Sequence, residues 1–186
     1  NQKILSGIWS PVAERRQSLY GPKAFRLLNE NYDLAIGGWT PSKLPILLQY
    51  NLHYFDDLNS QNANDRAKWH HDLIAQWIIE NPPAQGRGWE PYPTSLRITN
   101  WIKWALSGGC LPLEAKLSLV VQTRWLTRRL EWHLLGNHLF VNAKALVFSG
   151  LFFEPVLAPK IACWYVVWLN GQLYRNAWVL GSNTVE

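Results

Sequence analysis

The chain contains little cysteine, little charge and no unbroken apolar run, and each shortage excludes a class of protein. Its 186 residues include two cysteines, Cys110 and Cys163, too few for a disulfide scaffold or a cluster of thiolate metal ligands. Charged residues make up 17% of the chain and hydrophobic residues 48%, a balance typical of a folded globular domain. The most apolar stretch, residues 145–169, contains two prolines and two charged residues, so we expect no membrane span.

The chain also lacks methionine, position 1 included, and has no basic segment leading into an apolar run at its start. No secretory signal is therefore visible. These features predict a fragment of a longer protein, and residues 181–186 resemble an arbitrary end. The residues by themselves leave the cellular location open.

Aromatic residues, by contrast, are abundant: 12 Trp, 7 Tyr and 6 Phe. This is more than a core of this size needs, so we predict that some of them line a groove for a flat-faced ligand such as a sugar. The net charge of +5 favours acidic partners but is too evenly spread to predict a nucleic-acid partner. The chain has no phosphate-binding glycine loop, nucleophile elbow or zinc-protease motif, and its histidine spacings do not indicate a metal site, so we expect no cofactor.

The periodicity of apolar residues predicts an all-α fold. Residues 1–40 are expected to be irregular, with one short helix at 23–30, because proline and glycine interrupt them repeatedly. From residue 41 onward the spacing is helical and the breaks are short, which predicts antiparallel helical hairpins in one domain, 41–186. The expected helices span 41–55, 64–80, 94–106, 112–135, 138–153 and 158–174.

Two polar residues, Asn137 and His138, stand at the start of the helix expected at 138–153, which is otherwise apolar. A helix N-terminus carries free N–H groups and a partial positive charge, so it attracts anions. Asn and His donors at this position could bind a carboxylate. The structural alternative is that Asn137 only caps the helix, as Asn commonly does, and that His138 is a surface residue.

Two further groups of residues could contact a ligand. The loop 88–92 contains Trp89, Glu90 and Tyr92, and Arg97 and Trp101 follow it; together they could form a sugar platform with a guanidinium for acidic groups. The alternative is a loop held by its aromatic residues and an Arg–Glu pair. His53, within an apolar helix, could face a cleft, although the pattern favours the edge of an amphipathic helix.

Three segments resemble the N-terminal domain of heparinase II/III-like polysaccharide lyases. They are residues 50–56 (YNLHYFD), 88–104 (GWEPYPTSLRITNWIKW) and 134–146 (LLGNHLFVNAKAL), and the resemblance extends from about residue 25 to 153. It implies an incomplete (α/α) toroid, normally followed by a β-sandwich domain that this chain lacks. Such lyases are often periplasmic or secreted.

The resemblance also implies β-elimination in a polysaccharide that contains uronic acid. Donors that neutralise the uronate carboxylate stabilise the anion formed when the C5 proton leaves. Asn137 matches the family's Asn in that role, and His138 matches the next position. Trp89, Glu90, Tyr92, Arg97, Trp101 and His53 fall where cleft residues are expected.

The family's catalytic Tyr motif, which would follow residue 153, is not found in this chain. We therefore expect the carboxylate-binding half of the site without the proton-transfer half. Two alternatives stay open: a non-catalytic carbohydrate-binding α-domain, and an (α/α)-toroid glycoside hydrolase. The hydrolase would need a pair of catalytic carboxylates, for which Glu90 and Asp56 are the candidates.

Overall fold

The computed structural model describes residues 14–134 and 136–153, and this part of the chain is mostly helical. The α-helices are α1 (Leu34–Gly37), α2 (Ile46–Leu52), α3 (Ala67–Glu80), α4 (Pro91–Leu106), α5 (Leu113–Leu126) and α6 (Asn137–Phe152). Short 3-10 helices are η1 (Asp56–Asn59), η2 (Ala63–Arg66) and η3 (Arg87–Trp89). The expectation of a mostly helical fold from residue 41 onward is confirmed for the described residues. Within the described ranges no helix has the length and apolarity needed to cross a bilayer.

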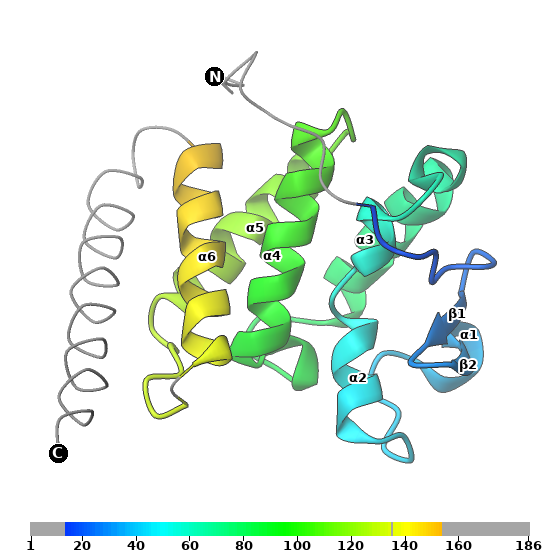
Figure 1. Cartoon of the computed structure of the whole chain (residues 1–186), viewed down its shortest axis with the longest axis horizontal. Helices are drawn as coiled ribbons and strands as arrows, with labels where there is room; N and C mark the ends of the chain where they lie inside the picture. The colour runs from blue at the N-terminus through cyan, green and yellow to red at the C-terminus, as the bar shows by residue number, and fades with distance from the viewer. Residues whose placement is uncertain (1–13, 135, 154–186) are drawn as a thin grey trace, which may run out of the picture.

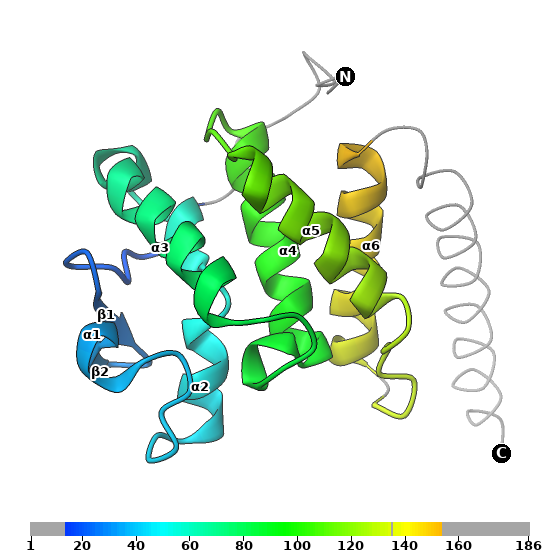
Figure 2. The ribbon, with the colours of Figure 1, turned by 180° about the vertical axis from the view of Figure 1, so that it is seen from behind.

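The long helices lie in two layers (Figures 1 and 2). Helices α4 and α6 lie side by side on one face, and α3 and α5 lie on the other. Successive helices α4, α5 and α6 run antiparallel, so α4 and α6 are parallel and begin at the same end of the molecule. The core between the layers is rich in tryptophan: Trp77, Trp89, Trp101 and Trp104 are all buried in it.

Helix α4 is the central helix of the described chain, although α6 has the more apolar sequence. Helix α4 packs against α5, α6, η1 and η3, and most of its side chains are buried. Helix α6 leaves Phe140 and Leu151 exposed. An apolar composition therefore did not by itself indicate the central position.

A β-hairpin replaces the helix expected at residues 23–30. Strand β1 (Ala24–Leu27) pairs antiparallel with β2 (Glu30–Asp33), and Phe25 lies opposite Tyr32. Leu28 and Asn29 form the two-residue turn with φ of 50° and 70°, the left-handed geometry that hairpin turns require. Leu27 is buried in the same core as the helices, so the hairpin packs onto the helical part.

Helix α5 ends at Leu126, earlier than the expected residue 135. Beyond it the chain forms tight turns, and the Glu131 backbone N–H donates to Asn142 Oδ1 of α6 at 3.0 Å. That bond draws the chain away from the axis of α5. Gly136 stands directly before α6 with φ of 95°, a conformation that favours glycine. The helix expected at 158–174 lies outside the described residues.

Candidate functional site

The candidate site lies where α4 and α6 begin side by side. Tyr92 is in the first turn of α4 and His138 in the first turn of α6, and their ring centroids are 4.5 Å apart. Both residues are partly exposed. Two helix N-termini therefore meet at one place. Helix α6 contributes partial positive charge from its first N–H groups, whereas α4 contributes less because Pro91 and Pro93 have no N–H.

Glu131 holds His138 in position. The His138 Nδ1 atom lies 3.1 Å from Glu131 Oε1, and the Asn142 amide donates to Glu131 Oε2 at 3.2 Å. Asn142 also donates to the Ser95 hydroxyl of α4 at 3.0 Å, and it is fully buried. The Glu131 side chain is only 12% exposed, so it is a fixed acceptor for Nδ1 of His138. The other ring nitrogen, Nε2, is then left for a ligand.

Asn137, the residue expected to grip a carboxylate, is exposed at the same end of α6. It is the first residue of the helix and not its cap, because Gly136 precedes it in the cap position. No side-chain bond caps this helix, and the described chain offers the Asn137 amide no hydrogen-bond partner. The amide is therefore available to solvent beside His138.

Glu90 lies on the α4 side of the site in a network of its own. Tyr50 of α2 donates to Glu90 Oε2, and Arg87 donates to Glu90 Oε1 at 3.0 Å and to Gln49 at 3.2 Å. Burial, together with the bond to Glu90, raises the pKa of Tyr50 to about 12. Tyr50 therefore stays protonated as a donor, and Glu90 is a carboxylate held by a tyrosine and an arginine.

Arg97, expected to bind acidic groups, is instead a fully buried residue of α4. Its guanidinium lies 3.8 Å from the centroid of the Trp77 ring and donates to Gly88 O at 2.8 Å and Gln122 Oε1 at 2.9 Å. Among the described residues no carboxylate pairs with it. Burial lowers the pKa of Arg97 well below its usual value. In this structure Arg97 braces the loop 86–90 and has no contact with solvent.

The remaining predicted contacts also lie in the interior. Trp89 is 3% exposed and donates through its indole to Asn81 O at 3.0 Å, and Trp101 is fully buried beside Phe55. His53 is also fully buried and accepts a bond from the Trp77 indole at 3.0 Å. Burial, with the nearby charge of Arg97, lowers the pKa of His53 to about 3, so this ring is neutral.

The predicted site residues thus divide into two sets. Asn137, His138 and Tyr92 come together at the helix ends, with Glu90 at the base of α4, while Trp89, Arg97, Trp101 and His53 support that end from inside. Sequence reasoning missed Glu131, which lies in the turns between α5 and α6 and pairs with His138 of α6. No contact joins Glu90 to Asp56, which instead pairs with Arg15 at 2.5 Å.

The described residues contain no group of three or more His, Cys, Asp or Glu side chains that could hold a metal ion. Comparisons with family models, with curated proteins and with solved structures find no match for this chain.

Proposed function

We propose that this chain is part of a polysaccharide lyase and that Asn137 and His138 neutralise the carboxylate of a uronic acid. Helical hairpins such as α4–α5 and α5–α6 are the repeating unit of the incomplete (α/α) toroid to which we assign the fold. The observation that carries the proposal is the pair of exposed donors, Asn137 and His138, beside the partly exposed ring of Tyr92 at two adjacent helix N-termini.

The chemistry of uronate cleavage explains why such donors are needed. A base removes the C5 proton, the freed electron pair forms the C4=C5 double bond, and the C4–O bond breaks as its oxygen takes up a proton. Negative charge develops on the carboxylate during proton removal. Donors fixed at that carboxylate lower the barrier because they are already oriented before the charge appears.

Glu131 is a positioning residue in this proposal. Its carboxylate faces Nδ1 of His138, which favours a proton on that nitrogen and a defined ring orientation. Tyr92 limits the ring from the other side. Nε2 then carries a proton toward the ligand when the ring is cationic, and Asn137 adds a neutral donor beside it.

Binding is the first test, because the chain lacks a recognised proton-transfer group. Isothermal titration calorimetry with uronate oligosaccharides prepared from alginate and heparan sulfate should show binding that neutral cello-oligosaccharides of equal length do not show. Loss of a donor to a charged acceptor costs about 1.5–3 kcal/mol, so Asn137→Ala and His138→Ala should each weaken binding about tenfold or more. The matched controls are Asn64→Ala, at an exposed position, and His71→Ala, at a partly exposed position of α3. Equal binding of neutral and acidic oligosaccharides would contradict the proposal.

Turnover separates the lyase from a carbohydrate-binding domain. Prolonged incubation of the chain with the same uronates, followed by the ultraviolet absorbance of the unsaturated product, should reveal slow cleavage that Asn137→Ala abolishes. A missing acid or base group lowers a rate by about a hundredfold to ten-thousandfold, so we expect turnover to be weak. Specific binding without any unsaturated product would favour the binding domain over the lyase.

A further inference from the structure

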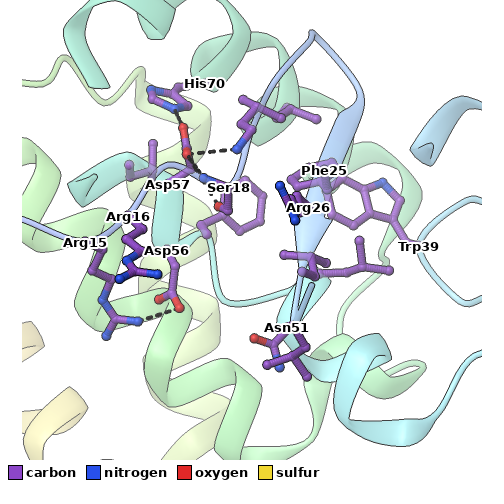
Figure 3. A pocket seen from close by; sticks show the side chains of 17 residues that line it. Arg15, Arg16, Ser18, Phe25, Arg26, Trp39, Asn51, Asp56, Asp57 and His70 are labelled. Atoms are coloured by element: carbon purple, nitrogen blue, oxygen red, sulfur yellow. Dashed lines mark hydrogen bonds and ion pairs between the residues drawn. The ribbon is translucent and has the colours of Figure 1, made fainter. Parts of the chain in front are cut away.

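A cavity of about 140 Å³ lies away from the helix ends, between the N-terminal segment and the elements α2, η1 and α3 (Figure 3). Its wall comes from residues 15–19, strand β1 with Leu28, Trp39, the end of α2 with the residues around η1, and one face of α3. None of the residues of the candidate site lines it. It is therefore a separate place at which a ligand could bind.

The interior of the cavity is apolar and partly aromatic. Phe25, Trp39 and Phe55 line it together with leucines. Phe55 has φ of 58°, a left-handed conformation that is unfavourable for a bulky residue. Its ring packs between Trp39 and Trp101, with ring centroids 5.9 Å and 5.4 Å away. The packing fixes this wall, so the cavity has a defined shape.

The acidic groups of the cavity are already neutralised. Asp57 is bonded by Arg66 at 2.9 Å and by His70 at 2.8 Å, and Asp56 is paired with Arg15. Two further arginines, Arg16 and Arg26, line the cavity, are exposed, and form no ion pair with any described residue. Figure 3 shows Arg26 beside Phe25, and Arg16 farther away beside Arg15 and Asp56. Among the described residues, these two positive charges of the lining have no counter-charge.

We propose that this cavity binds a small ring-shaped carboxylate, with the ring against the aromatic wall and the carboxylate at the guanidinium of Arg26, which lies beside Phe25. The volume suits one six-membered ring, because an apolar cavity of about 150 Å³ accommodates benzene. Guanidinium groups match the planar geometry of a carboxylate and bind it through paired hydrogen bonds. Ring and charge are both required by this arrangement, which distinguishes it from a site for free inorganic anions.

Three probes of similar size test the proposal on the full chain. Benzoate carries the ring and the charge, benzyl alcohol carries the ring alone, and inorganic phosphate carries charge alone. Binding is measured by isothermal titration calorimetry and by the NMR shift of the Trp39 indole N–H, assigned with a Trp39→Phe variant. That N–H is buried and has no partner among the described residues, so it should respond to a ligand in the cavity. Benzoate is expected to bind at least about tenfold more tightly than either other probe.

A variant at the mouth of the cavity completes the test. Arg26→Gln should weaken benzoate binding about tenfold, and this side chain is exposed, so the change should not unfold the protein. Arg128→Gln, an equal loss of charge at an exposed position beyond α5, should leave binding unchanged. The proposal is overturned by equal affinity for benzyl alcohol or phosphate, by an unmoved Trp39 signal, or by an equal effect of Arg128→Gln.

Discussion

Two carboxylate–histidine pairs in this molecule use the same chemistry in opposite surroundings. Asp57 and His70 are 2.8 Å apart and are 6% and 2% exposed, whereas Glu131 and His138 are 3.1 Å apart and are 12% and 39% exposed. Around Asp57 the backbone N–H groups of Ser18 and Leu19 add further bonds to the carboxylate. The first pair is almost completely buried, and the second is open on its histidine side.

The difference shows how burial assigns a role to a histidine. Burial by itself raises the pKa of Asp57, but the bonds from His70, Ser18 and Arg66 outweigh it and hold the pKa well below its ordinary value. This carboxylate therefore joins the N-terminal segment to η2 and α3 as a structural anchor. The same donor–acceptor pair at Glu131 keeps His138 at the surface, where it can meet a ligand.

The largest effect should come from breaking the enclosed pair. Asp57→Asn leaves the Arg66 guanidinium buried without a counter-charge, which costs about 3–5 kcal/mol. Glu131→Gln removes a partly exposed partner and should cost about 1 kcal/mol or less. Urea unfolding of the two variants and the wild type measures both losses. Equal losses at the two sites would show that burial is not what separates them.

The pH dependence of stability should be set by the buried titratable groups His53 and Asp57. The pKa of His53 in the folded chain is about 3, below the usual value near 6.5, so between these values the unfolded chain binds a proton that the folded chain does not. The contribution of His53 to the free energy of unfolding should therefore be constant above pH 6.5. Below that pH it should fall by about 1.4 kcal/mol per pH unit. At lower pH, protonation of Asp57 removes a further contribution, because its pKa is lowered on folding.

Unfolding free energies measured at intervals from pH 7 to pH 4.5 provide the test. His53→Gln keeps an acceptor for the Trp77 indole but cannot be protonated. The slope of its unfolding free energy against pH should therefore be smaller than in the wild type, by the amount that corresponds to about one proton. His133→Gln, at an exposed position, is the matched control and should keep the wild-type slope. An unchanged slope in His53→Gln would mean that another group accounts for the pH dependence.

The sequence predicted the long helices well where apolar spacing and breakers agreed. The spacing of Trp69, Leu73 and Trp77 indicated α3, and the prolines at 82 and 83 indicated its end. The β-hairpin at 24–33 was missed because four-residue strands give too short a pattern to distinguish from a helical turn. Asn29, in the left-handed turn, was the available signal.

The candidate site was predicted in part, for a physical reason. Asn137 and His138 could be located because a polar pair at the start of an apolar helix is a local signal. Trp89, Arg97 and Trp101 could not be assigned to surface or interior, because tryptophan and arginine pack against each other equally well in a core and in a groove. Glu131 needed the fold, since only the early end of α5 brings its carboxylate to His138.

The smallest expected change in stability is at the open pair, Glu131 and His138. The enclosed pair should matter more for stability, and the open pair should matter more for ligand binding. His70→Gln removes a buried partner of Asp57 and should lower the free energy of unfolding by about 1–3 kcal/mol, while uronate binding at the helix ends is unchanged. His138→Gln should lower it by less than about 0.5 kcal/mol, because the side chain is partly exposed, yet weaken binding. Urea unfolding and calorimetric titration on the same two preparations measure both quantities. If His138→Gln destabilised the fold more than His70→Gln, the open pair would be a structural anchor as well, and its histidine would not be reserved for a ligand.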